Sequence, residues 1–367
     1  MLNHFINNQI MKKSQLILAA ALVALAACNK DSFDLTGPNT LDNEIGFNAV
    51  TKKATKANDA IITGAVYDTL TNNSFKVWGW QTEKEGNDAY SDINDADASN
   101  FMSNLTIEWT GGRLGRKNAW RNADNYYYWP FTGRISFLAI HPSTVAPTST
   151  AWDATNTMPK AYIENYTVEA KDSTDLMFAS NEGARMANAL PMMFKHALSQ
   201  IQFRVRTNED YAADTVEFKV DSIKINSIDL TGNVTYEADT VAWAANTDQV
   251  DSSVYFNKES QVVNYYATDA AAELYGRALV MIPQPANVLD ANAVPEDTVQ
   301  TTLTVGYTMK QKNYAAISGT VTVPAPQEWL AGKRYLYTLN FKLNEILFNP
   351  SVTEWVDVNV QTINILD

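Results

Sequence analysis

Alternating apolar and polar residues restrict much of this chain to β-strands. Between 201 and 206 an apolar residue (Ile201, Phe203, Val205) precedes a polar one at each step, which is typical of a strand with one buried face. Tyr, Trp and Phe make up 11% of the residues, and this share favours strands over helices. Further strands of this kind are expected at 216–228, 261–267, 278–283, 300–308 and 334–343.

The first half of the chain carries shorter strand patterns. Residues 135–140 are apolar at almost every position, which predicts a central strand. Loops are expected at 83–100 and 142–160, and one short helix at 267–276. Strands are also expected at 45–50, 75–80, 125–130, 162–168 and 176–179. Short strands repeated in two halves predict an all-β protein with two β-sandwich domains, 45–187 and 188–367.

The N-terminus has the pattern of a secretory signal. Lys12 and Lys13 follow Met11, the expected true start, and precede an apolar run at 16–27. The run ends in Leu-Ala-Ala before Cys28, which resembles a bacterial lipobox. The resemblance implies cleavage of residues 1–27, a lipid on Cys28 and a tether over 28–44. Because Cys28 is the single cysteine of the chain, no intramolecular disulfide can form.

The charge of the mature chain excludes one class of partner. The full chain has 28 basic and 41 acidic residues, and residues 1–27 contain Lys12 and Lys13 but no acid. The mature chain therefore carries 26 − 41, a net charge of −15. Such a surface repels nucleic acids and anionic lipids. No nucleic-acid partner is expected.

An ordered set of stretches resembles the fimbrillin family, the pilin-like lipoproteins of type V pili. The set contains Phe75–Trp80, Tyr127–Pro130, Ile135–Pro142, Phe194–Ile201, Met281–Gln284 and Trp329–Tyr337. The resemblance implies two transthyretin-like β-sandwich domains in tandem, assembly by strand exchange, and a place at the outer membrane and in extracellular fimbriae. The resemblance also implies maturation by cleavage, since stalk members of the family are cut after an arginine in the link that follows the first strand. Here that link carries Lys52, Lys53 and Lys56, and the first arginine is Arg113.

Strand exchange provides a physical mechanism for assembly. Cutting at Lys52, Lys53 or Lys56 removes the strand at 45–50 together with the lipid, and an opened sheet edge is a template for another strand. The C-terminal segment 352–366 is the expected donor. The apolar side chains of this segment change from even to odd positions near Gln361, which predicts a β-bulge there. The donor side chains are Val356, Val358, Val360, Ile363 and Ile365. Partners are therefore other copies of the chain or related pilin subunits.

Enzymatic and metal sites find little support. Besides His4 in the leader, the histidines are His141 and His196, which leaves little material for a Ser-His-Asp triad or a multi-histidine metal site. His196 is expected to be a structural hydrogen-bonding residue. The acidic run at 92–97 places Ala96 and Asp97 where a calcium loop needs a ligand and a glycine. No catalytic residue, metal or cofactor is expected.

Two functions remain open at this point. The first is a structural subunit of fimbriae that supports adhesion. The second is a lipid-anchored surface module that binds a glycan or a host protein and does not polymerise. The aromatic stretches 78–80 and 126–129 could stack on sugars, although aromatic residues at strand spacing more often fill a core. An exposed aromatic row would favour the second function.

Overall fold

The computed structural model describes a set of segments in the C-terminal nine-tenths of the chain. They are 43–51, 74–82, 101–109, 120–168, 174–207, 209–211, 216–244, 252–284, 301–325, 328–342, 346–354 and 361–362. All lie in one compact unit, Leu41–Asp367, whereas a second unit, Met1–Thr40, lies outside the described residues. Secondary structure in the described segments is strand apart from η4 (Asp269–Ala271), a single 3-10 turn. The all-β prediction is confirmed, and the helix expected at 267–276 is only this turn.

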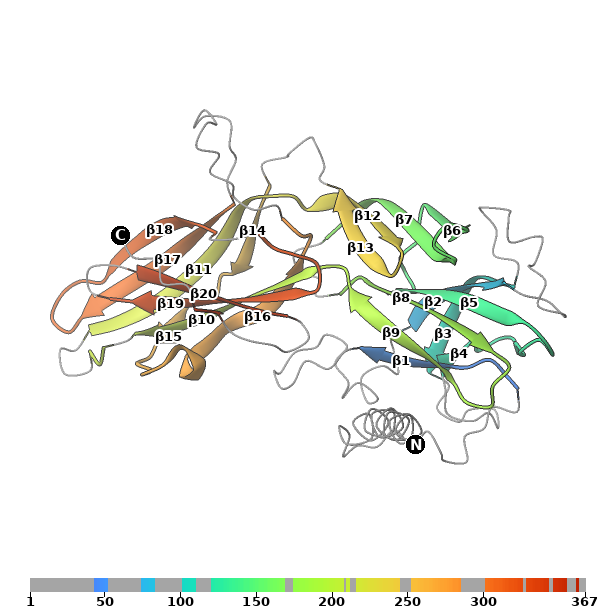
Figure 1. Cartoon of the computed structure of the whole chain (residues 1–367). Helices are drawn as coiled ribbons and strands as arrows, with labels where there is room; N and C mark the ends of the chain where they lie inside the picture. Colours follow the sequence, from blue (N-terminus) through green and yellow to red (C-terminus); the bar gives the residue numbers. More distant parts are fainter. Residues whose placement is uncertain are drawn as a thin grey trace, which may run out of the picture. The chain divides into compact units, whose positions relative to one another are not determined.

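Seven strands between Phe47 and His196 form a closed barrel. They hydrogen-bond in the order β1–β4–β3–β2–β5–β8–β9, and β9 returns to β1. The strands are β1 (Phe47–Thr51), β2 (Ser74–Gln81), β3 (Met102–Trp109), β4 (Trp120–Arg121), β5 (Arg134–His141), β8 (Met177–Ala184) and β9 (Leu190–His196). Figure 1 shows β1 beside β9. The aromatic rings of Phe75, Trp120 and Phe137 occupy the barrel core.

A four-stranded sheet covers one outer face of this barrel. Its order is β13–β12–β7–β6, from β6 (Ser149–Asp153), β7 (Met158–Thr167), β12 (Thr231–Glu237) and β13 (Thr240–Ala244). β5 serves both layers, because Ile135 and Phe137 face the barrel core whereas Leu138 and Ile140 pack with the covering sheet. This double burial is the reason for the nearly continuous apolar run at 135–140.

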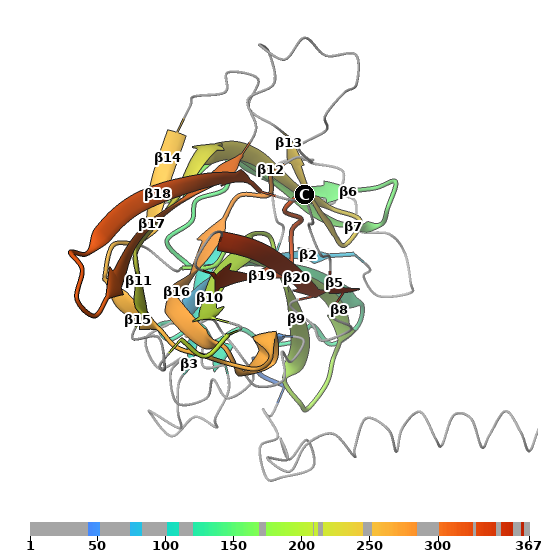
Figure 2. The same ribbon diagram turned by 90° about the vertical axis from the view of Figure 1, so that its left-hand side faces the viewer.

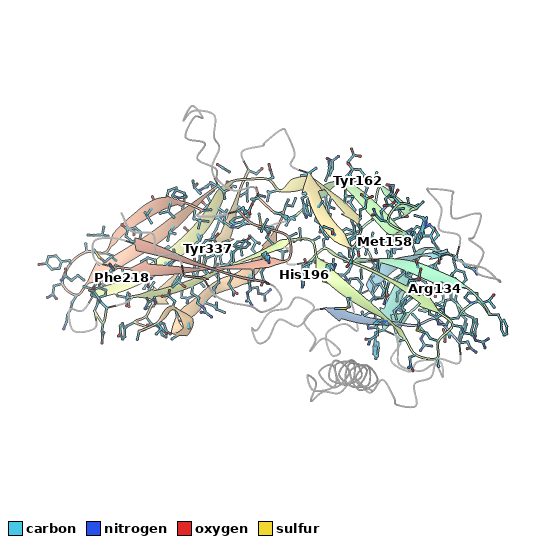
Figure 3. All side chains as sticks on the ribbon, in the orientation of Figure 1. Arg134, Met158, Tyr162, His196, Phe218 and Tyr337 are labelled. Carbon is cyan, nitrogen blue, oxygen red and sulfur yellow. The ribbon has the colours of Figure 1, made fainter. Side chains whose placement is uncertain are left out.

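Two five-stranded sheets enclose the core of the second half. The strands β16–β10–β19–β20–β21 form one sheet, and β14–β11–β17–β18 form the other, with β15 paired to β11. Figure 2 shows β10 between β16 and β19. Phe218 and Tyr337 are buried in the shared core (Figure 3). The bounds are β10 (Ser199–Thr207), β11 (Val216–Ile228), β14 (Ser252–Asn257), β15 (Gln261–Val263), β16 (Glu273–Met281), β17 (Thr302–Gln311), β18 (Ile317–Pro324), β19 (Lys333–Phe341), β20 (Ile346–Glu354) and β21 (Gln361–Thr362).

Several sequence-based expectations need correction. Residues 125–130 contain an isolated bridge at Tyr128 rather than a strand. The backbone there pairs with the short segment before β1, through Glu44 and its neighbours. The loop expected at 142–160 contains β6 and the start of β7. Strand pairing crosses the expected domain boundary at 187/188. β9 and β12 lie after this boundary, yet β9 closes the barrel and β12 pairs with β7. The division into domains 45–187 and 188–367 stays a prediction.

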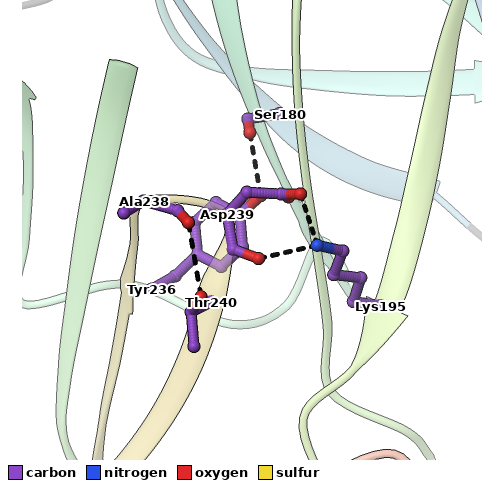
Figure 4. A network of polar contacts seen from close by, with 6 residues as sticks. All are labelled: Ser180, Lys195, Tyr236, Ala238, Asp239 and Thr240. Carbon is purple, nitrogen blue, oxygen red and sulfur yellow. Dashed lines mark hydrogen bonds and ion pairs between the residues drawn. The ribbon is translucent and has the colours of Figure 1, made fainter. Parts of the chain in front are cut away.

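A tight turn joins the covering sheet to the barrel. Between β12 and β13, Ala238 and Asp239 both have positive φ angles, 48° and 57°, as a two-residue type I′ hairpin requires. Asp239 accepts a hydrogen bond of 2.8 Å from the Tyr236 hydroxyl and pairs with Lys195 of β9 (Figure 4). The Tyr236 hydroxyl also lies 2.8 Å from the Ser180 hydroxyl on β8. Burial raises the pKa of Tyr236 well above its ordinary value, so this hydroxyl stays protonated.

The Ala238→Gly substitution should stabilise the protein. A left-handed backbone is unfavourable for alanine and available to glycine, so the free energy of unfolding should rise by about 0.5–1 kcal/mol. Ala242→Gly is the matched control, because Ala242 lies in extended β13, and there glycine should lower the free energy of unfolding by about 0.5–1 kcal/mol. Urea unfolding of both variants tests the pair. A destabilised Ala238→Gly variant contradicts the assigned turn.

A buried cluster of titratable groups joins the ends of β5 and β9. His196, at the end of β9, pairs through Nδ1 with Asp175, and both side chains are buried. His141, at the end of β5, has its Nδ1 3.1 Å from the carbonyl oxygen of Ser74. Burial lowers the pKa of His141, while Asp175 and the Ser74 carbonyl oppose this effect and His196 adds to it. His141 is therefore neutral in the folded protein near neutral pH.

This cluster predicts loss of stability in mild acid. The folded pKa of His141 lies below its ordinary 6.5, so the unfolded chain binds the proton first as pH falls. The free energy of unfolding should therefore decrease below pH 6.5 and level off once the folded protein also binds the proton. Urea unfolding between about pH 7.5 and 5.5, where most carboxylates stay ionised, should show a smaller decrease for His141→Gln. Equal decreases in both proteins would refute this assignment.

Candidate functional site: the seat of the first strand

The first strand is held by hydrogen bonds along both of its edges. β1 runs parallel to β9 from the pair Phe47–Leu190 to the pair Thr51–Phe194, and antiparallel to β4 at Phe47–Trp120. Before β1, the Ile45 amide donates to the Tyr127 carbonyl at 2.7 Å and the Trp129 amide donates to the Asn43 carbonyl at 2.9 Å. The segment 43–51 therefore fills the gap between β4 and β9 and closes the barrel. We call this gap the strand seat.

The inner face of the segment is apolar and aromatic. Ile45 and Phe47 are 2% and 1% exposed, and the Phe47 ring packs edge-on against Phe137 with centroids 5.2 Å apart. The Phe75 ring is also edge-on to the Phe47 ring, with centroids 6.3 Å apart. Burying one isoleucine and one phenylalanine contributes about 3–6 kcal/mol. Loss of the segment would expose an apolar groove between two open strand edges.

The outer face of the segment carries a buried ion pair. Arg121 Nη1 of β4 donates to Glu44 Oε2 at 2.5 Å, and the two side chains are 2% and 9% exposed. A buried charge needs a partner, because transfer out of water is costly for an isolated ion. The pair therefore ties the start of the segment to β4. Sequence reasoning missed both residues, because no local pattern links positions 77 residues apart.

The expected donor segment starts inside the second half's own sheet. β20 pairs with β19 along its whole length, from Phe341–Ile346 to Lys333–Glu354. β21 then folds back on β20 through the pairs Ser351–Thr362 and Val352–Gln361. β21 is thus a two-residue edge strand, held by much less pairing than β20.

Most of the residues singled out in the sequence lie outside the described part of the chain. These are Cys28, Lys52, Lys53, Lys56, Val356, Val358, Val360, Ile363 and Ile365, and the acidic run at 92–97. Their roles stay predictions. β1 ends at Thr51, immediately before the lysine link.

The aromatic stretches divide between core and surface. Trp78, Trp80 and Trp129 are at most 5% exposed, as expected for core residues. Tyr126 and Tyr128 are each 53% exposed, and their rings stack with centroids 6.4 Å apart. The expected structural role of His196 agrees with its pairing to Asp175. Within the segments described, no group of three or more His, Cys, Asp or Glu side chains is placed to hold a metal ion, and no helix is long and apolar enough to cross a bilayer.

Comparison with known proteins points to one family. A fimbrial protein from Bacteroides vulgatus has a similar fold, with a TM-score of 0.58, 20% identity, and coverage of 85% of this chain and 99% of its own. A protein from Bacteroides ovatus described as a candidate cell adhesion protein gives a TM-score of 0.51 at 14% identity, covering 86% of this chain and 99% of its own. These likenesses show the fold. No curated protein is detectably similar in sequence.

The family model with the description "fimbrillin-like" matches residues 50–355. The match covers most of the chain, from the end of β1 to the end of β20. The expected family is thereby confirmed: the chain belongs to the fimbrillin-like family.

Proposed function

We propose that this protein is a non-catalytic structural subunit of cell-surface fimbriae that supports adhesion. In this proposal it is exported as a lipoprotein, held at the outer membrane through Cys28, and built from two tandem transthyretin-like domains. The observation that carries the proposal is the position of β1. The strand that closes the barrel is followed directly by the lysine link, so one cut separates that strand from the rest of the chain.

Removal of the first strand prepares the barrel for a neighbour. Cutting at Lys52, Lys53 or Lys56 releases 45–50 with everything before it. The strand seat then presents the free edge of β9 and the core rings that contacted Phe47. An open edge beside an apolar groove accepts a new strand by main-chain hydrogen bonds and side-chain pockets.

The C-terminal segment of another copy can fill the seat. Its Val356, Val358, Val360, Ile363 and Ile365 would add on the order of 6–15 kcal/mol before the costs of ordering, at about 1.5–3 kcal/mol for each buried side chain. The short pairing of β21 with β20 is a small barrier to release of this segment. Head-to-tail donation gives an open polymer.

One observation favours the second function. The stacked and half-exposed rings of Tyr126 and Tyr128 offer faces on which a sugar ring can stack. A lipid-anchored module that binds a glycan or a host protein without polymerising therefore remains the alternative. The two functions differ in the fate of β1, which stays in place in the alternative.

The fimbrial proposal predicts that a cut in the link starts polymerisation. A chain that begins at Asn29, treated briefly with a lysine-specific protease, should lose its N-terminal segment and form polymers visible by size-exclusion chromatography and electron microscopy. The triple variant Lys52→Gln, Lys53→Gln, Lys56→Gln is the matched control. Its link resists the protease, so it should stay monomeric.

Truncation tests the other partner of the exchange. Deletion of 355–367 removes the donor side chains but leaves β20 complete, so the cut protein should stay monomeric. If the cut full-length protein is a monomer, or if the truncated protein polymerises equally well, the strand-exchange proposal is wrong.

A further inference from the structure

β18 (Ile317–Pro324) is an edge strand whose second side is open. It is the last strand of the sheet β14–β11–β17–β18 (Figure 2), and it pairs with β17 from Met309–Ile317 to Thr302–Pro324 without a register shift. No other described strand pairs with it. Alternate residues of an antiparallel strand direct their N–H and C=O groups to each side. The open side of β18 therefore carries a row of backbone groups that can receive a further strand.

The other edge strands in the described part of the chain have features that oppose such pairing. β14, at the opposite edge of the sheet, has two register shifts, and the Lys258 ammonium lies 3.9 Å from the centre of its Tyr255 ring. β16 has a register shift, and its Gly276, at a φ of 69°, precedes exposed Arg277. β20 contains Pro350, and β6, β13, β15 and β21 have five residues or fewer. Bulges, charges, prolines and short length are the usual protection of edge strands.

β18 lacks these protective features. It has eight residues, none of them charged, and its single proline is the last residue. Residues 313–327 around it contain no charged side chain, although charged residues make up 19% of the chain. A long, regular and uncharged edge is typical of a strand that another polypeptide chain joins.

Both faces of β18 suit a continued sheet. On the inner face, Val321 and Val323 pack against the core of the second half. On the outer face, Ser318, Thr320 and Thr322 are exposed. The first and the last of these hydroxyls bond to threonines of β17 at 2.9 and 2.8 Å. A further strand with the same residues would extend the apolar layer on one face and the row of hydroxyls on the other.

We propose that β18 joins two copies of this protein, through antiparallel pairing of β18 with β18 of a second copy. Charge favours this contact, because the chain carries a net charge of −13 and two copies repel one another unless they meet through an uncharged surface. An antiparallel pair of identical strands has a two-fold axis, so a single edge is its own complement. No second surface is needed.

Direction and register follow from the neighbours of β18. Lys312 lies in the turn before the strand. Parallel pairing in register would bring the two lysines together, whereas antiparallel pairing places them at opposite ends of the contact. The valine face continues across the junction only when valines oppose inward residues of the other copy, since a slip of one residue would move them to the hydroxyl face.

A contact made by one edge strand is small, so a single pair associates weakly, with a Kd of roughly 0.1–1 mM. The chain is therefore monomeric at the micromolar concentrations that suit the cleavage experiments. In fibres, two neighbours lying side by side would repeat the contact many times, and this multivalency would hold them together. Only this last step rests on the fimbrial proposal.

Charge placed on the open edge tests the contact. In sedimentation equilibrium, the uncut chain beginning at Asn29 should form dimers as its concentration rises to about 1 mM. Thr320→Lys brings like charges of the two copies together and should raise the Kd about 10-fold. Thr132→Lys adds the same charge at an exposed position in another part of the chain and should dimerise like the wild type. Melting temperatures report whether both variants fold.

Two results of this experiment would overturn the pairing between copies. One is an equal Kd for all three proteins, which would place the dimer contact elsewhere on the surface. The other is a wild-type protein that stays monomeric at about 1 mM, which would leave the edge to an unlike chain. Both results leave the fimbrial proposal standing, because the uncut chain undergoes no strand exchange.

Disulfide cross-linking tests the direction of pairing. The chain beginning at Asn29 has no cysteine, so Ser318→Cys, Thr320→Cys and Thr322→Cys can be oxidised alone and in equal mixtures. Antiparallel pairing should link only combinations whose position numbers share one sum, such as 320 with 320 and 318 with 322, because only facing side chains come within disulfide distance. Thr132→Cys should stay unlinked. Linkage of every position to itself, as in a parallel pair, or no linkage in any mixture, contradicts the proposed contact.

Discussion

Closure of the barrel by one short N-terminal strand is the constraint on which the first half of this protein depends. β1 is the link between β4 and β9, which otherwise have no pairing with each other among the described strands. The strand supplies hydrogen bonds to both neighbours and places Phe47 among the core rings. It is also the only described strand that a cut in the lysine link detaches, since every other described strand follows that link. The segment that closes the barrel is therefore also the one that a cut in the link would release.

The two faces of this segment have different physical roles. The inner face contributes apolar burial, which any strand with suitable side chains can supply. The outer face contributes the Glu44–Arg121 pair, whose energy depends on one charge at one place. Apolar contacts hold the strand in the seat, and the ion pair ties the start of the segment to β4. The covering sheet contacts the barrel at a different place. Tyr236 bonds to Ser180 of β8, and Asp239 pairs with Lys195 of β9.

The sequence predicted those strands whose burial is simple. β11 coincides with the expected 216–228, and β5, β10 and β19 differ from expectation by a few residues. Strands were predicted less well where their formation depends on a pairing partner that is distant in the sequence. β6 and β18 were not expected, because no side chain of β18 is fully buried and β6 follows a proline-rich stretch. Residues 125–130 have strand composition, but they make an isolated bridge to the segment before β1. Strand 45–50 was expected, whereas the ion pair was not, because it joins residues far apart in the chain.

The parallel alignment of β1 with β9 has a consequence at a larger scale. In the proposed strand exchange, an incoming strand that repeats the pairing of β1 runs parallel to β9, with the same N-to-C direction as β1. Because each proposed junction joins the tail of one subunit to the seat of the next, every junction has the same orientation. A fibre built in this way is polar: one terminus displays an empty seat and the other a free tail, so the two termini differ in which subunits they can recruit.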